Sequence, residues 1–108
     1  MPLTLFGSRL RTKVLVVVGA LEESYPAEIA RITGASLLPV QRVIRALEES
    51  GVVVTRARGR TRLVTLNRRF FAHNELYALL LRCSERPEFA NMIAVRRRPR
   101  ATAKPLPS

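Results

Sequence analysis

The stretch that decides the fold is TGASLLPVQRVIRALEESGVVVTRARGRTRLVTL, residues 33–66. Its first half predicts a helix over residues 37–50, with Ser36 as the N-cap and Gly51 as the residue that ends it. The side of this helix that we expect to be buried carries apolar residues at helical spacing: Val40, Val43, Ile44 and Leu47.

The spacing of apolar residues then changes from helical to alternating. Residues 52–58 and 61–66 are rich in Val and Thr and predict two strands, with Gly59 in the turn between them. The β-branched residues lie at the root of this hairpin and the arginines at its tip. A β-hairpin, or wing, is therefore expected over residues 52–66.

The flanking sequence predicts three more helices. Apolar residues at helical spacing favour helices over residues 9–21, 26–32 and 73–82, and the second of these ends at Gly34. The element order predicts a mainly α fold with a small β-hairpin. This order of elements is typical of a winged helix-turn-helix with a three-helix core, a wing and a C-terminal helix.

The pattern of apolar residues divides the chain into a folded part and a tail. We expect residues 1–86 to form the winged helix-turn-helix domain with its C-terminal helix. Residues 87–108 contain proline and basic residues without a core-forming period, so we expect a disordered basic tail.

The charge of the chain predicts a polyanionic partner. Its 108 residues include 19 basic and 8 acidic side chains, which gives a formal net charge of +11. Four arginines lie on the predicted wing, and no acidic residue lies among them: Arg56, Arg58, Arg60 and Arg62. Such a cluster is attracted to phosphates, and the residues at the tip, beside Gly59, have the position needed to enter a minor groove.

Residues 5–81 resemble the winged-helix transcriptional regulators of the arsenic-repressor and multiple-antibiotic-resistance-repressor type. The resemblance rests most strongly on ALEESGVV, residues 46–53, which links the third helix to the wing. It also includes Glu28-Ile29-Ala30, Gly34 with Ser36, and Arg58-Gly59-Arg60. It implies a DNA-binding domain whose third helix lies in the major groove.

The resemblance also implies which residues of that helix face the groove. They are Ser36, Leu37, Leu38, Pro39, Gln41, Arg42 and Arg45. Leu37, Leu38 and Pro39 depart from the family, which more often has polar residues there. The leucines are suited to contact thymine methyl groups, to pack inward or to pack against a partner chain. Gln41, Arg42 and Arg45 are therefore the better candidates for base contacts.

Several other classes of protein are disfavoured. Cys83 and His73 are the only residues of their types and make a poor metal site, and the chain contains no aspartate to hold magnesium. We expect no cofactor, no metal and no enzymatic activity. The longest apolar run, from residue 14 to 18, is far shorter than a membrane span. We therefore expect a cytoplasmic, nucleoid-associated protein.

The sequence thus predicts a DNA-binding transcriptional regulator whose partner is double-stranded DNA. The recognition helix, residues 37–50, would lie in the major groove and the wing, residues 52–66, on the backbone or in the minor groove. Apolar residues near and within the last helix favour a homodimer that pairs through it. A protein-interaction module and an RNA-binding winged helix stay open as alternatives.

Overall fold

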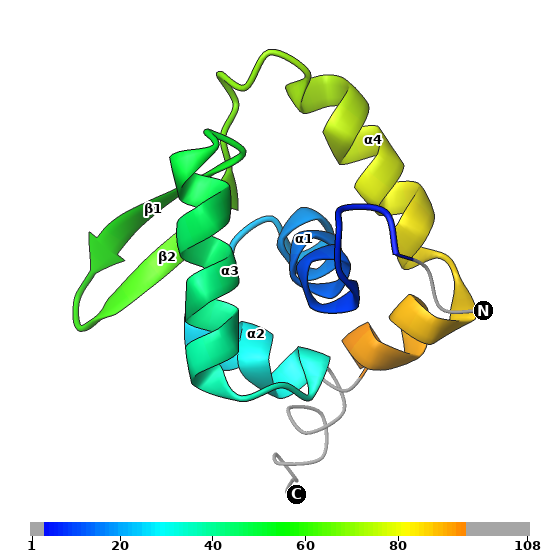
Figure 1. Cartoon of the computed structure of the whole chain (residues 1–108), viewed down its shortest axis with the longest axis horizontal. Helices are drawn as coiled ribbons and strands as arrows, with labels where there is room; N and C mark the ends of the chain where they lie inside the picture. Colours follow the sequence, from blue (N-terminus) through cyan, green and yellow to red (C-terminus); the bar gives the residue numbers. More distant parts are fainter. Residues whose placement is uncertain (1–3, 95–108) are drawn as a thin grey trace, which may run out of the picture.

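The computed structural model describes residues 4–94 and confirms the predicted fold class. Its elements are α1 (Arg9–Leu21), α2 (Pro26–Thr33), α3 (Leu37–Glu49), β1 (Val53–Arg58), β2 (Thr61–Leu66) and α4 (His73–Ser84). A further helical segment covers residues 87–94. The other elements surround α1, which is seen end-on near the centre of Figure 1.

The central position of α1 follows from its sequence. Residues 14–19 are buried, including four valines that point to different sides of the helix. A helix that is apolar all round is stable only when other elements cover it on all sides. Its start is fixed by Ser8, whose side chain accepts a hydrogen bond of 3.0 Å from the backbone N–H of Arg11.

Gly19 allows α4 to pack closely against α1. A Cβ placed on Gly19 would lie 2.9 Å from the Cβ of Leu80, which is fully buried. Gly19 is thus a point of close contact between the two helices. A side chain there would push α4 away from the core.

The loop between α1 and α2 is joined to the hairpin by backbone pairing. The N–H of Ser24 donates to the carbonyl of Val64 at 3.1 Å, and the N–H of Val64 donates back at 2.7 Å. The hydroxyl of Ser24 also donates a 2.7 Å hydrogen bond to Glu28 of α2. These bonds tie the base of the wing to the helical core.

The prediction that the tail begins at residue 87 is wrong for residues 87–94. They form a helix, and its side chains Phe89 and Ile93 are buried in the core cluster. Pro87 begins this helix because a proline is tolerated in the first turn, where its missing N–H has no partner to lose. Residues 95–108, the remainder of the expected tail, lie outside the described part of the chain.

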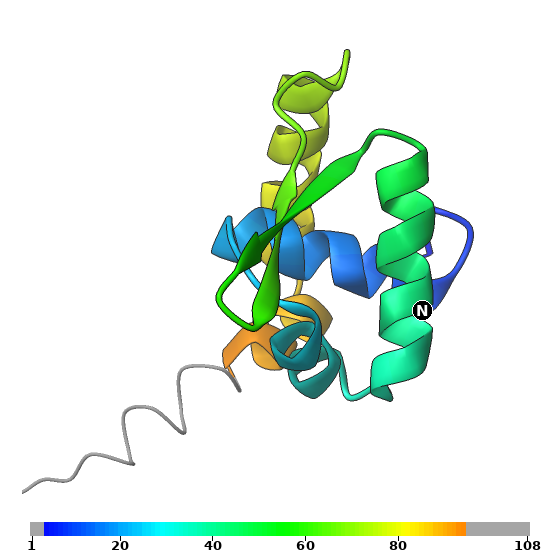
Figure 2. The same cartoon turned by 90° about the vertical axis from the view of Figure 1, so that its left-hand side faces the viewer.

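Element boundaries shift slightly from those expected. The recognition helix ends at Glu49 with Ser50 as its C-cap, β1 begins at Val53, and α4 extends to Ser84. Together, α3 and the hairpin occupy the side of the molecule opposite α4 (Figures 1 and 2).

Candidate nucleic-acid interface

The turn between α2 and α3 sets the direction of the recognition helix. Gly34 ends α2 in the left-handed conformation, with φ at 75°, and the hydroxyl of Thr33 donates to the carbonyl of Ile29 at 2.8 Å. Ser36 occupies the N-cap position of α3 with extended backbone angles. Its side chain makes no capping hydrogen bond, so its exposed hydroxyl lies beside the first turn of the helix.

The outer face of α3 carries the predicted groove-facing side chains. The helix buries Val40, Ile44 and Leu47 against the core. The exposed residues of the helix include four of the predicted candidates: Leu38, Gln41, Arg42 and Arg45. The structure therefore brings these four candidates together on one stripe that is open to a partner.

Leu37 and Leu38 are exposed although they are strongly apolar. Their exposed fractions are 44% and 55%, and both lie in the first turn of α3. Inward packing, one of the three interpretations of these leucines, is therefore wrong. Contact with thymine methyl groups and contact with a partner chain stay open.

The register of the hairpin divides the wing arginines between two faces. Arg56 and Arg58 alternate with Ala57, which lies opposite Arg62 in the antiparallel pairing. Cross-strand partners share a face of the sheet, so Arg62 points to the side opposite Arg56 and Arg58. Arg60 lies in the turn beside Gly59, and all four arginines are exposed.

Arg62 is bound to the protein itself. Its Nη2 donates a hydrogen bond of 2.7 Å to the hydroxyl of Thr55, which in turn donates to Oε2 of Glu48 at 2.8 Å. This chain of bonds links β2 through β1 to the end of α3. Thr55 and Glu48 were not predicted as part of the site, because only the cross-strand register brings them to Arg62.

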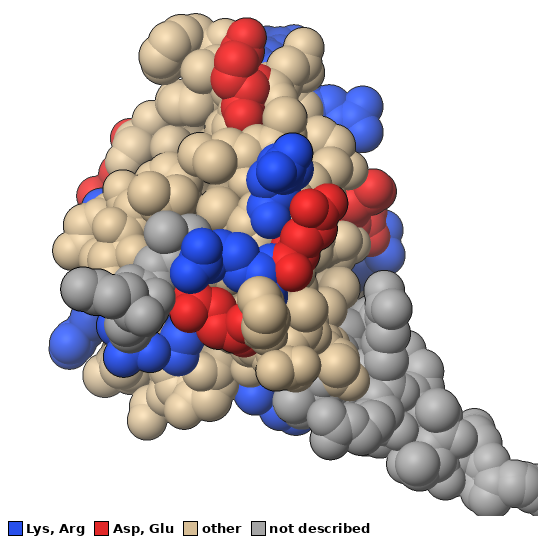
Figure 3. All heavy atoms as spheres, turned by 90° about the vertical axis from the view of Figure 1, so that its right-hand side faces the viewer, with Lys and Arg blue, Asp and Glu red and all other residues tan. Residues whose placement is uncertain are grey.

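The arginines on the outer surface of α3 and at the wing tip have no such partner in the described part of the chain. Ion pairs there join only Arg82 to Glu85 and Arg86 to Glu88, outside α3 and the wing. Residues 50–74 contain no acidic residue at all. By contrast, the side of the molecule away from the wing shows basic and acidic side chains interspersed (Figure 3). Among residues 4–94, positive charge on the wing is therefore less neutralised than on that side of the molecule.

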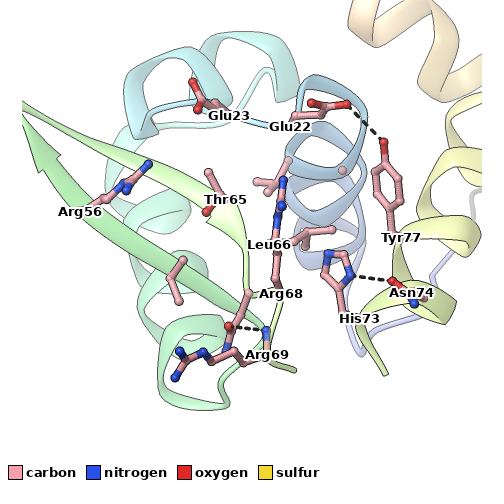
Figure 4. Close-up of a pocket in the computed structure, with 14 residues that line it drawn as sticks. Glu22, Glu23, Arg56, Thr65, Leu66, Arg68, Arg69, His73, Asn74 and Tyr77 are labelled. Carbon is pink, nitrogen blue, oxygen red and sulfur yellow. Dashed lines mark hydrogen bonds between the residues drawn. The ribbon is translucent and has the colours of Figure 1, made fainter. Parts of the chain in front are cut away.

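A pocket of about 820 Å³ lies between the hairpin, the end of α1 and the start of α4. Figure 4 shows the Tyr77 hydroxyl directed at Glu22, to which it donates a hydrogen bond of 3.3 Å. Arg56 and Arg68 line the same pocket, as does Glu23. Acidic and basic side chains therefore share this pocket, whereas the tip of the wing carries basic side chains alone.

The buried thiol of Cys83 belongs to the core rather than to this surface. Desolvation raises its pKa above the ordinary value, an effect that the nearby Arg86 partly opposes. Within residues 4–94, no cluster of three His, Cys, Asp or Glu side chains is placed to hold a metal ion. No helix in the same span is both long and apolar enough to cross a membrane.

Comparison with solved structures identifies similar folds. A mutant of ZitR from Lactococcus lactis matches 75% of this chain at a TM-score of 0.57 and 16% identity. The match spans 62% of the ZitR chain, so this chain is shorter than that protein. A MarR-family transcriptional regulator from Silicibacter pomeroyi matches 94% of this chain and 75% of its own, with a TM-score of 0.58 and 13% identity.

The oxidized form of MarR from E. coli is similar to the same degree. It matches 91% of this chain and 76% of its own, at a TM-score of 0.57 and 19% identity. No family model matches the sequence, and no curated protein matches it. At such identities the likeness concerns the fold alone, and it confirms the predicted winged-helix fold.

Proposed function

We propose that this protein is a transcriptional regulator that binds duplex DNA. In this proposal α3 enters the major groove with Ser36, Leu38, Gln41, Arg42 and Arg45, while Arg56, Arg58 and Arg60 follow the backbone or enter the minor groove. Arg62 is also on the wing, and its bond to Thr55 gives it a supporting part in orienting the hairpin.

The observation that carries the proposal is the placement of unneutralised charge. Arg42 and Arg45 on α3 and Arg58 and Arg60 on the wing are exposed on two neighbouring elements. Protein–DNA contacts need cations along the phosphates together with an element that fits the major groove, and this face supplies both. The solved structures of similar fold include proteins named as transcriptional regulators, which supports the same assignment.

We further infer that two copies pair through α4 and the residues before it. Phe71 is 92% exposed, and Leu79 and Leu81 of α4 are also exposed, although all three are apolar. Leu79 also lines an apolar pocket of about 450 Å³, together with Phe70 and Leu76. Pairing would cover this surface and would present two recognition helices to a palindromic site.

The test is selection from a pool of random DNA duplexes at two salt concentrations. The wild-type chain is expected to enrich a common motif that survives the higher salt. A variant with Arg42→Ala and Arg45→Ala is expected to lose the motif. A control with Arg86→Ala, a basic residue outside α3, the wing and α4, is expected to keep it.

Other results would contradict the proposal. Motif-free retention that disappears at the higher salt would mean that only phosphates are held, and the protein would not be a sequence-specific regulator. Tighter binding of duplex RNA than of duplex DNA would favour the RNA-binding alternative. Binding that is insensitive to salt and to the arginine substitutions would favour a protein-interaction module.

A further inference from the structure

The first turn of α3 places two leucines where a DNA-binding surface ordinarily has polar groups. Leu37 and Leu38 are about half exposed, whereas the apolar residues of the next turns, Val40 and Ile44, are buried. The leucines are therefore not part of the core. They form an apolar end to the stripe that continues along the outer face of the helix.

The neighbours of these leucines indicate what covers them. Helical spacing puts Arg42 four residues and Arg45 seven residues after Leu38, so all three share one face. Both arginines are exposed, and neither is bonded to another described residue. An apolar contact flanked by free cations fits a duplex, because its phosphates bind the arginines while its base edges meet the leucines.

Only one feature of a base in the major groove suits an aliphatic side chain. The edges of guanine, cytosine and adenine present hydrogen-bond donors and acceptors, and only thymine adds a methyl group at C5. The N-terminal turn of a recognition helix is the part that contacts base edges. A leucine side chain in that turn can neither accept nor donate a hydrogen bond, so it selects bases through the methyl group alone.

We propose that Leu37 and Leu38 read thymine methyl groups, and that each half-site of the target carries thymine beneath the first turn of α3. This inference rests on the proposed function, since it assigns a base preference to the same surface. It gives the two leucines a role in specificity, while the arginines supply the affinity that does not depend on sequence.

Replacing thymine by deoxyuridine tests the inference, because the substitution removes the methyl group and leaves base pairing intact. The probe is the duplex that the wild-type chain enriches from the random pool. Each deoxyuridine beneath the first turn of α3 is expected to weaken wild-type binding about fourfold, the effect of burying one methyl group. Deoxyuridine elsewhere in the probe is expected to leave the affinity unchanged.

The matching protein variant is the double substitution Leu37→Ala and Leu38→Ala. It should bind the thymine and deoxyuridine probes equally, because alanine at these positions does not reach the methyl group. Leu5→Ala is the control: Leu5 is 45% exposed, lies before α1, and should leave the fourfold preference intact. Circular dichroism of each variant verifies that its helices are retained, as expected for exposed leucines replaced by a good helix former.

Three results would overturn the inference while leaving duplex binding established. The wild type could bind both probes equally, the double variant could retain the fourfold preference, or the selected motif could lack thymine in both half-sites. The second result, together with loss of self-association in the double variant, would assign the leucines to a partner chain. Failure to retain any DNA duplex would instead refute the proposed function itself.

Discussion

Substituting single wing arginines separates side chains that reach phosphates from one that holds the wing in place. An arginine that neutralises one phosphate of duplex DNA contributes about 0.9 to the slope of log affinity against log salt concentration. Arg58 is exposed near the tip of the hairpin, without an ion-pair partner among residues 4–94. Arg58→Ala should therefore lower the slope by about 0.9.

This change in slope corresponds to a measurable change in affinity ratio. Between about 50 and about 200 mM salt, the ratio of wild-type to Arg58→Ala affinity should shrink about 3.5-fold. Arg62→Ala should change the slope by less than about half as much. The reason is that the Arg62 guanidinium is held 2.7 Å from the Thr55 hydroxyl, and both side chains lie on the face of the hairpin opposite Arg58.

Arg62→Ala is expected instead to make the wing less ordered. The substitution removes the bond to Thr55, which also contacts Glu48 of α3. Backbone amides of residues 53–66 should then exchange with solvent faster than in the wild type, because the hairpin loses a link to the recognition helix. Arg58→Ala should leave their exchange unchanged.

Fluorescence anisotropy with a random-sequence duplex, measured over a series of salt concentrations, gives the slopes directly. Arg82→Ala is the matched control, since this side chain is 82% exposed and pairs with Glu85 on the other side of the molecule. Equal slope changes for Arg58→Ala and Arg62→Ala would refute the idea that Thr55 restrains Arg62. An equal change for Arg82→Ala would show that the wing is not the phosphate-binding face.

Three further predictions concern the core. Gly19→Ala should lower the free energy of unfolding by about 1 kcal/mol in urea titrations, because a clash with Leu80 at 2.9 Å outweighs the gain in helix propensity; an unchanged midpoint would contradict the close packing of α1 and α4. Phe89→Ala should cost about 3 kcal/mol or more, while Phe71→Ala, at a side chain 92% exposed, should change the stability of the monomer by less than about 0.5 kcal/mol. Equal effects would mean that residues 87–94 do not pack on the core. Burial raises the pKa of Cys83, so the folded chain holds that proton more tightly than the unfolded chain does. This contribution to stability is present below the ordinary thiol pKa and is lost as pH rises through the raised value. Wild type should therefore lose more stability than Cys83→Ala between about pH 7 and about pH 10, and equal losses would contradict a buried thiol.

Local signals in the sequence were sufficient for the order and type of most elements. Glycine and serine at the ends of helices, together with the change from helical to alternating spacing after residue 51, predicted α1 to α4 and the hairpin. These signals depend on side chains within a few residues of one another, so they can be recognised without knowledge of the tertiary structure.

The features that were missed depend on partners distant in sequence or on a misleading composition. The pairing of Ser24 with Val64 joins residues 40 positions apart, and nothing in the local sequence marks Ser24 as a strand-like residue. Residues 88–94 contain five apolar side chains, but they lie between Pro87 and a run of arginines, and the basic composition of that run was extended over them. Phe89 and Ile93 nevertheless lie four residues apart, which places them on one face of a helix that closes the core.

The candidate site was predicted unevenly for the same reason. Exposure of Gln41, Arg42 and Arg45 followed from helical spacing alone, since the buried side of α3 was already defined. The separation of Arg62 from Arg58 required the cross-strand register, which the sequence did not specify. Sequence therefore located the charged surface, and the register determined which of its arginines are free.

Different residues can carry affinity and base preference in this proposal because the wing and α3 are held together. The bond from Thr55 to Glu48 fixes the wing against the end of α3, and Ser24 fixes the base of the wing to the core. In the proposed complex, arginines on the wing would hold phosphates without choosing a sequence, and the register they impose would bring the first turn of α3 to the base edges. The leucines of that turn would then need no hydrogen-bonding group, because the arginines would already position the helix and only the contact with a thymine methyl group would discriminate between bases.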